Sequence, residues 1–176
     1  GRQAAGAGRA FPMERYVDLL ENSWEGFSAH PYALRDGHVT FGIGRAVESE
    51  NDFVGFAERF RTPDGRQPTE DEMRAEYRRT RDTEREIQTY RMPHQRDDFI
   101  GNERYEGVSH LTISREEARA IVGEYVKDLL SHTNIAVFPN FSSLPDDAKI
   151  AVIDVGYPCG PGALHRKNGS KKFLQS

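Results

Sequence analysis

The chain of 176 residues has little cysteine, no surplus of positive charge and no long apolar run. Its single cysteine, Cys159, excludes an internal disulfide and a zinc cluster built on thiolates, and we interpret it as a small packed hydrophobic residue. Lysine and arginine (24) do not outnumber aspartate and glutamate (28), so nucleic acid is not the expected partner. The apolar runs are shorter than the roughly 18 residues that a membrane span needs, and no secretory signal peptide is visible.

The length predicts one domain, or one domain with two small lobes, large enough to bury a core without staples. The opening GRQAAGAGRA has no methionine and is typical of a linker, which we place at residues 1–12. We expect a small lobe at about 13–68 and a helical lobe at about 69–176. From this linker-like opening we expect a piece of a larger protein. The polar end of the chain, which has no closing helix, indicates that a C-terminal segment is missing as well.

Hydrophobic spacing and capping signals predict four helices. The first covers 13–25 and ends before Gly26. Two more begin at capping boxes, Thr69–Glu72 and Ser114–Glu117, and reach about residues 90 and 130. The fourth covers 146–157 and is strongly apolar. The inward positions of the third helix are Ala118, Ile121, Val122, Tyr125 and Leu129. The second has such a thin apolar stripe that we expect most of its surface to be solvated.

A β-hairpin is predicted at residues 31–44, because Asp36-Gly37 is a strong signal for a two-residue turn. We expect loop-like structure over 45–68 and irregular structure over 91–110. The predicted class is therefore α+β, mainly helical, with one small sheet early in the chain.

A two-residue turn would place Leu34 opposite Val39 and Arg35 opposite His38. Side chains alternate along a strand, so two faces are expected. The core face would carry Tyr32, Leu34, Val39, Phe41 and Ile43. The polar face would carry Arg35, His38 and Thr40, with Gly42 and Gly44 leaving it shallow enough for a ligand to approach the backbone.

Glu25 ends the first helix and can face that polar surface. The negative end of the helix dipole, together with loss of water near Trp24 and Tyr32, favours a protonated carboxyl and a raised pKa. A carboxylic acid that keeps its proton near neutral pH is what a glycosidase uses to protonate the leaving oxygen. The alternative from spacing alone is a salt bridge from Glu25 to Arg35 or Arg45.

The stretch WEGFSAHPYALRDGHVTFGIG resembles the catalytic entry of the phage-type lysozymes. The matching features are Glu25-Gly26, Tyr32 seven residues after Glu25, and Thr40-Phe41-Gly42-Ile43-Gly44, and the separation of fifteen between Glu25 and Thr40 needs no gap. Phe138-Pro139, Leu144-Pro145 and DDAKIAVIDVGYPCGPGAL resemble the core helix and glycine turn of that family's larger lobe. We find no match over roughly 45–110.

The resemblance implies a lysozyme-like fold in which a small hairpin lobe and a larger helical lobe flank a cleft. It implies a metal-free, cofactor-free muramidase that cleaves the β-1,4 bond between N-acetylmuramic acid and N-acetylglucosamine in peptidoglycan. Glu25 would be the general acid and Thr40 would position the attacking water. Tyr32, Arg35, His38 and Gly42 would contact the glycan strand.

The sequence departs from the family at the second carboxylate, because Leu34 stands where an aspartate is usual. Asp36 at the hairpin tip is the nearest candidate, and a role in turn geometry is the alternative for it. Four other carboxylates remain open, namely Glu48, Glu50, Asp52 and Glu21. Without a second carboxylate the water would lack a base. Pro158 also replaces an asparagine that is often found in the larger lobe's turn.

The remaining groups indicate no competing chemistry. No two of the six histidines stand at metal-ligand spacing, and no nucleophile elbow or phosphate loop occurs. We expect a monomeric antibacterial effector, delivered into a rival's periplasm for instance by a type VI secretion system and paired with an immunity protein that plugs its cleft. A phage endolysin is the alternative setting. A non-catalytic peptidoglycan-binding module and a lytic transglycosylase are the alternative functions.

Overall fold

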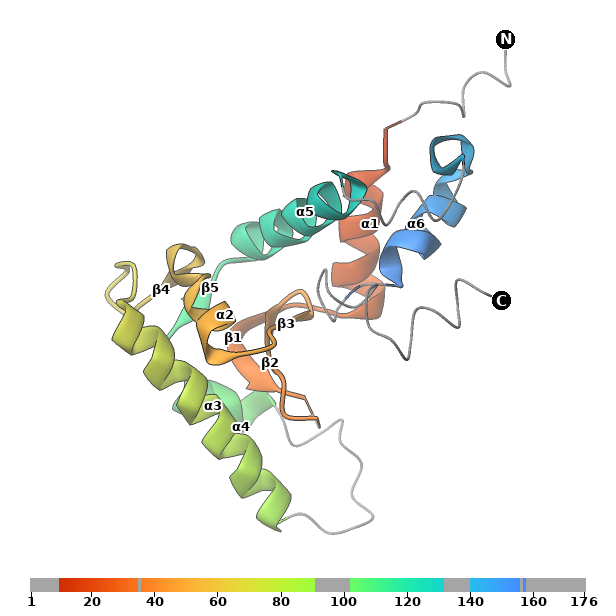
Figure 1. Ribbon diagram of the computed structural model, residues 1–176. Coiled ribbons are helices and arrows are strands. Elements are labelled where there is room, and N and C mark those ends of the chain that lie inside the picture. Colours follow the sequence, from red (N-terminus) through yellow and green to blue (C-terminus); the bar gives the residue numbers. More distant parts are fainter. Residues whose placement is uncertain (1–9, 35, 91–101, 132–139, 156, 158–176) are drawn as a thin grey trace. The chain divides into compact units, whose positions relative to one another are not determined.

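The computed structural model describes residues 10–34, 36–90, 102–131, 140–155 and 157. It is a mixed α+β fold in which helices predominate, so the predicted class is confirmed (Figure 1). The chain divides into two compact units. We call Phe27–Arg119 the hairpin unit, and Gly1–Gly26 together with Ala120–Ser176 the terminal unit. Among the described helices, none is both long and apolar enough to cross a membrane.

The terminal unit is built on helices. Helix α1, Met13–Leu19, continues into a π-helical turn over Leu20–Trp24, so the predicted helix 13–25 is confirmed with a widened last turn. Helix α6, Asp146–Asp154, is shorter than the predicted 146–157. Helix α5, Arg115–Ser131, belongs to this unit from Ala120 onward. A 3-10 turn, Phe141–Ser143, precedes α6.

The core of the terminal unit joins side chains that are far apart in sequence. Its buried hydrophobic members are Tyr16, Val17, Leu20, Ile121, Val122, Tyr125, Val126, Leu129, Phe141, Ile150, Ile153 and Tyr157. The rings of Tyr125 and Tyr157 meet edge to face with centroids 5.1 Å apart. All five inward positions predicted for α5 are buried, which confirms its helical phase.

The hairpin unit contains a three-stranded antiparallel sheet in the order β1-β2-β3, formed by Ser28–Ala33, Val39–Gly42 and Arg45–Ala46. A second, two-stranded sheet pairs β4, Phe60–Arg61, with β5, Thr112–Ile113. The predicted hairpin is confirmed, but its turn is not.

The two-residue turn is wrong by one residue. Tyr32 pairs with Thr40 and Ala33 with Val39, and the Leu34 N–H donates to the His38 carbonyl at 2.9 Å. The Gly37 N–H donates to the Leu34 carbonyl, and Gly37 has φ of +87°. This is a wider turn closed by a left-handed glycine, a common alternative for hairpins. Because of this shift, Leu34 lies outside the core and is 36% exposed.

An aromatic cluster forms the core beneath the sheet. Phe41 contacts Phe53, Phe56 and Phe60 edge to face, with centroids 5.0–5.8 Å apart. Phe53 belongs to α2, Glu50–Val54, a helix that was predicted as loop. Its Ser49 side chain accepts a hydrogen bond from the Asp52 N–H at 3.2 Å, an N-cap whose sequence signal was overlooked.

Helix α3, Glu70–Tyr90, begins at the predicted capping box. The Glu72 carboxylate accepts from the Thr69 N–H at 2.8 Å, and the Thr69 hydroxyl accepts from the Glu72 N–H at 3.2 Å. Its buried stripe is largely polar, which explains the weak apolar pattern. The stripe consists of Met73, Glu76, Thr80 and Thr83.

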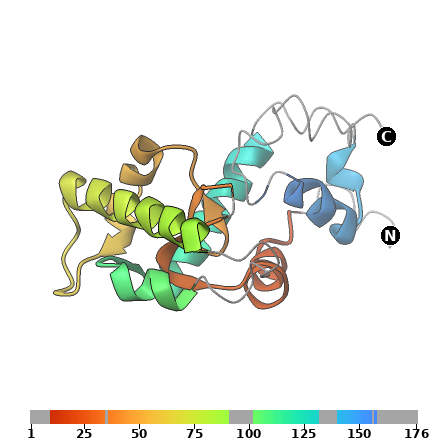
Figure 2. The same ribbon diagram turned by 90° about the horizontal axis from the view of Figure 1, so that it is seen from below.

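The predicted lobe boundary near residue 68 differs from the observed division, because α3 lies in the same unit as the hairpin (Figures 1 and 2). Arg81 of α3 donates to the Gly37 carbonyl at 2.6 Å, and the rings of Tyr77 and Phe53 have centroids 6.0 Å apart. Helix α4, Asn102–Val108, packs along α3, so the expectation of irregular structure over 91–110 is wrong for these residues.

Candidate active site

Glu25 follows the π-helical turn directly and closes the helix. The Leu20 carbonyl accepts hydrogen bonds from both the Glu25 N–H at 2.7 Å and the Gly26 N–H at 3.1 Å. Gly26 has φ of +77°, which lets the chain leave the helix in a left-handed step. The widened turn therefore fixes the backbone from which the Glu25 side chain projects.

The Glu25 carboxyl lies in surroundings that favour its neutral form. The residue as a whole is exposed, but loss of water around the carboxyl raises its pKa, and the negative charge of Asp154 raises it further. The direction is the one expected from the sequence. The second cause was missed, and its only sequence signal is an aspartate within the apolar run of α6.

Asp154 lies near the end of α6, where it is held by α1. The buried Tyr16 hydroxyl donates to Asp154 Oδ1 at 3.1 Å, and the Tyr16 ring contacts the Trp24 ring with centroids 6.5 Å apart. Loss of water raises the pKa of Asp154, although the Tyr16 hydrogen bond opposes this. We call Tyr16, Trp24, Glu25 and Asp154 the acid cluster of the terminal unit.

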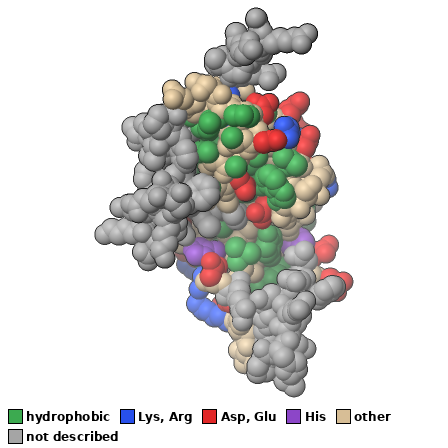
Figure 3. All heavy atoms as spheres, turned by 90° about the vertical axis from the view of Figure 1, so that its right-hand side faces the viewer, with side chains coloured by type: hydrophobic (Ala, Val, Ile, Leu, Met, Phe, Trp, Pro, Cys, Tyr) green, Lys and Arg blue, Asp and Glu red, His purple; other side chains and the backbone are tan. Residues whose placement is uncertain are grey.

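A cavity of about 380 Å³ borders the acid cluster. Its lining is mostly apolar, with Trp24 half exposed and the Asp154 carboxylate among the few polar groups. The lining residues are Leu19, Trp24, Asp147, Ile150, Ala151, Asp154 and Val155. An apolar hollow with few polar groups is the usual form of a small-molecule site. Figure 3 shows acidic side chains among hydrophobic ones on one face of the molecule.

The hairpin tip carries a carboxylate, Asp36, whose pKa is lowered. The His38 N–H donates to Asp36 Oδ1 at 3.0 Å, and His38 Nδ1 lies 2.7 Å from Asp36 Oδ2. Loss of water at Asp36 acts to raise its pKa, but these two hydrogen bonds and the His38 charge hold that pKa below its usual range. His38 Nε2 lies 3.9 Å from Glu48. Asp36 is therefore an ionised carboxylate with a turn-stabilising role.

Strand β2 contains two of the predicted site residues, Thr40 and Gly42, and a third, Tyr32, pairs with Thr40 from β1. Thr40 is 2% exposed, and its hydroxyl donates to the His38 carbonyl at 3.2 Å. Tyr32 pairs with Thr40 in the sheet and is partly exposed. The space beside Gly42 is not open, because an added Cβ would lie 3.1 Å from Ala118. The expectation that Gly42 leaves room for a ligand is corrected accordingly. The prediction for Arg35 falls outside the described residues.

The other candidate carboxylates differ in their ion pairs and in their exposure to solvent. Glu50 forms ion pairs with Arg74 at 3.1 Å and Arg78 at 2.8 Å, and the Arg78 hydrogen bond is the first cause of its lowered pKa. Asp52 is exposed in the first turn of α2, and Glu48 is exposed beside His38. Glu21 is 7% exposed within the π-helical turn.

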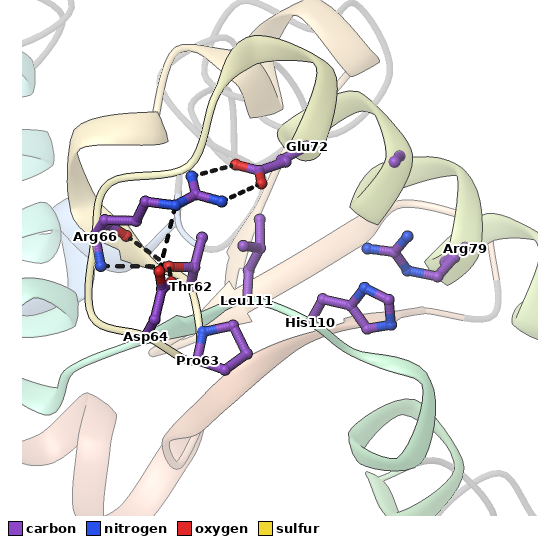
Figure 4. A pocket seen from close by; sticks show the side chains of 9 residues that line it. Thr62, Pro63, Asp64, Arg66, Glu72, Arg79, His110 and Leu111 are labelled. Carbon is purple, nitrogen blue, oxygen red and sulfur yellow. Dashed lines mark hydrogen bonds and ion pairs between the residues drawn. The ribbon is translucent and has the colours of Figure 1, made fainter.

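A larger cavity of about 470 Å³ lies in the hairpin unit, and none of the predicted site residues is among those that line it (Figure 4). Three of its charged groups, Asp64, Arg66 and Glu72, pair with one another. Arg66 lies 2.8 and 2.6 Å from the two oxygens of Glu72, and this pairing is the main cause that lowers the pKa of Glu72 to about 2. The Thr62 hydroxyl donates to Asp64, which also faces Arg66 at 3.6 Å. We therefore interpret these charged side chains as a structural ion-pair network that lines the cavity.

No model of a known protein family, no curated protein and no solved structure matches the chain. Within the part of the chain that the structure describes, no group of three or more histidine, cysteine or acidic side chains is arranged to hold a metal ion. Two candidate groups of site residues thus emerge, the acid cluster and the residues around the hairpin tip.

Proposed function

We propose that the protein is a peptidoglycan hydrolase with a lysozyme-like fold, a muramidase in which Glu25 is the general acid. The observation that carries this proposal is the Glu25 carboxyl, whose pKa is raised by loss of water at the end of a helix that leads into a Thr-x-Gly-x-Gly hairpin. A general acid must hold its proton at the working pH and lose it as the leaving group departs.

The proposed reaction is hydrolysis of the β-1,4 bond between N-acetylmuramic acid and N-acetylglucosamine. Glu25 donates its proton to the bridging oxygen, the bond from C1 to that oxygen breaks, and the N-acetylglucosamine hydroxyl leaves. A water attacks C1 and loses one proton to an ionised carboxylate, which restores a reducing muramic acid end. The Thr40 oxygen can accept a hydrogen bond from such a water while its own proton is engaged with His38.

Asp36 suits the role of the ionised carboxylate better than Glu50 does. Its lowered pKa keeps it charged, whereas Glu50 is engaged by two arginines. Glu48, Asp52 and Glu21 stay open as alternatives. Tyr32, Arg35 and His38 remain proposed contacts to the glycan strand.

A lytic transglycosylase is the second candidate, because Leu34 stands where the phage-type lysozymes usually have an aspartate. Such an enzyme uses one carboxylic acid and closes the muramic acid ring on itself, so it needs no second carboxylate to activate water. A non-catalytic peptidoglycan-binding module stands as the further alternative. The proposed setting is an antibacterial effector with a cognate immunity protein, or a phage endolysin.

The decisive experiment is digestion of purified sacculi followed by mass analysis of the soluble products. Reducing muramic acid ends from the wild-type protein, lost in Glu25→Gln, support the muramidase. We expect at least a hundredfold loss, the usual contribution of a general acid. Glu14→Gln, an exposed carboxylate of α1, is the matched control and should keep full activity. Anhydro ends would indicate the transglycosylase, and binding without products would overturn catalysis.

A further inference from the structure

The Arg79 side chain lines the larger cavity and uses little of its hydrogen-bonding capacity. A guanidinium carries five N–H donors. Within the described part of the chain, Arg79 donates a hydrogen bond from Nη2 to Glu76, and its Nε is buried without an acceptor. The side chain is 32% exposed, so a ligand in the cavity can reach it. Because unpaired donors are costly where water is scarce, Arg79 is suited to a ligand that accepts hydrogen bonds.

Glu76 holds Arg79 and the segment that carries His110 at the same point. Glu76 is fully buried, and its carboxylate accepts hydrogen bonds from the Ser109 hydroxyl, the His110 N–H at 3.0 Å and the Leu111 N–H at 3.4 Å. Arg79 pairs with the same carboxylate from the next turn of α3. One buried anion thus fixes the Arg79 guanidinium and the His110 backbone before any ligand binds, which lowers the entropic cost of binding.

The His110 imidazole is the second donor group at this end of the cavity. The residue is exposed, its side chain lines the cavity, and its hydrogen bonds to described residues come from the backbone N–H rather than from the ring. An imidazole carries at least one N–H donor in either protonation state. Figure 4 shows the ring and the Arg79 guanidinium on the same side of the cavity, away from the Arg66–Glu72 pair. Two donor groups from different elements therefore face one end of the cavity.

The other end of the cavity carries a surplus of negative charge. Two carboxylates, Asp64 and Glu72, share the single guanidinium of Arg66 there, and both have lowered pKa values that keep them ionised at neutral pH. Glu76 in turn offsets the charge of Arg79. A ligand with two negative charges, such as phosphate, would therefore be repelled. A single carboxylate gains directed hydrogen bonds with less repulsion.

We propose that this cavity binds a small organic acid, whose carboxylate accepts hydrogen bonds from the Arg79 guanidinium and the His110 ring. A guanidinium fits a carboxylate because its N–H groups lie in one plane and point the same way. The apolar part of the acid lies against Ala75 and Leu111, which also line the cavity. The volume of about 470 Å³ is within the range of small-molecule sites. The site lies entirely in the hairpin unit and takes no part in the proposed muramidase reaction.

The test is titration of the wild-type protein with isobutyrate, followed by the backbone amide signals in NMR spectra, with isobutyramide as an uncharged probe of the same shape. For so small an acid we expect a Kd of about 1 mM, and isobutyramide should bind about tenfold more weakly. The amide signals of residues 62–66, 75–79 and 110–111 should shift and saturate. No saturable shift there, equal binding of the two probes, or tighter binding of inorganic phosphate than of isobutyrate would overturn the proposal.

Two arginines of α3 give a matched pair of variants. Arg79→Met keeps a side chain of similar length without the N–H donors, and isobutyrate should bind it about tenfold more weakly. Arg78→Met removes the same charge from the neighbouring position, whose side chain is 68% exposed and is not among those that line the cavity. Its affinity should equal that of the wild type. Equal weakening in both variants would indicate a general effect of charge and overturn the site.

His110→Ala gives a second answer if Arg79→Met does not fold, because Arg79→Met leaves the buried Glu76 without its cation. The His110 residue is exposed, and alanine keeps the backbone N–H that Glu76 accepts. Isobutyrate should bind this variant about threefold more weakly. Unchanged affinity would overturn the two-donor site. Cleavage of sacculi has no bearing on these titrations, so failure of the muramidase proposal and failure of this site are separate results.

Discussion

The two groups of acidic residues differ in what surrounds them. In the acid cluster, loss of water raises the pKa of both Glu25 and Asp154, and the Asp154 charge raises the Glu25 pKa further. At the hairpin tip, Asp36 accepts two hydrogen bonds from His38, and its pKa is lowered. The same chemical group is thus prepared as an acid in one region and as a carboxylate in the other. The surroundings, not the residue type, decide the role.

The largest expected effect is the loss of stability caused by a substitution in the aromatic core that supports the hairpin. Phe41→Ala should destabilise the hairpin unit by about 3–5 kcal/mol, because it empties a fully buried site surrounded by aromatic rings. Urea unfolding measures it. Leu34→Ala, at an exposed position in the same hairpin, should change stability by less than about 0.5 kcal/mol. A comparable loss in both variants would show that the cluster is not the core.

Gly42→Ala tests how closely α5 approaches the hairpin. Gly42 has φ of +62° and a Cβ would lie 3.1 Å from Ala118, so we expect a loss of about 1–3 kcal/mol. Gly107→Ala is the control, because that glycine lies in α4 with open space around it. Alanine there should stabilise by about 0.5–1 kcal/mol. Thermal unfolding measures both, and a neutral Gly42→Ala would contradict the close approach.

Tyr16→Phe tests the anchor of the acid cluster. Removal of the hydroxyl leaves Asp154 without this hydrogen bond, and the expected cost is about 1–2 kcal/mol. Tyr125→Phe should cost less, because its hydroxyl donates to the Ile153 carbonyl over a longer distance of 3.4 Å. Denaturant unfolding of both variants gives the comparison. Equal losses of unfolding free energy in the two variants would contradict a stronger hydrogen bond at Asp154.

The smallest effect is an opposite pH dependence of the two units. Raised pKa values at Glu25 and Asp154 stabilise the terminal unit fully below the ordinary carboxyl pKa of about 4, and this stability is lost as pH rises through the raised values. Lowered pKa values at Asp36 and Glu72 stabilise the hairpin unit above about pH 4, and this is lost as pH falls through them.

Amide hydrogen exchange, corrected for the intrinsic effect of pH, resolves the two units separately. Acidification from about pH 7 to 4 should increase protection in α6, and further acidification should reduce it in β1 and β2. The second effect should be small, because the Asp36 and Glu72 side chains are 61% and 36% exposed and ion pairs near the surface contribute little. Parallel trends in the two units would contradict raised carboxyl pKa values in the terminal unit and lowered ones in the hairpin unit.

The sequence was sufficient where local chemistry decides the structure. The capping boxes at Thr69 and Ser114 begin helices as predicted, and the spacing in α5 identifies its buried face. The direction of the Glu25 pKa shift was predicted correctly from the expected loss of water around the carboxyl. These features depend on residues within one or two turns of each other.

The remainder depended on contacts between distant residues or on competing turn types. Asp36-Gly37 fits both a two-residue turn and the wider one that forms, so the register and the exposure of Leu34 were not decidable locally. The neighbour of Glu25 that matters, Asp154, is 129 positions away. Ala118 over Gly42 is equally non-local. Ser49 at the start of α2 is different, because its signal was present in the sequence and was overlooked.

The π-helical turn before Glu25 sets the phase of the helix end. A π turn holds one residue more than the α-helical turn it replaces. If Leu20–Trp24 continued as an α-helix instead, each residue would turn by about 100° around the axis, which is more than in the wider π turn. Glu25 would then point to a different side of the helix although no atom of the carboxyl had been altered. The π-helical turn thus determines the direction in which the carboxyl of the proposed acid points.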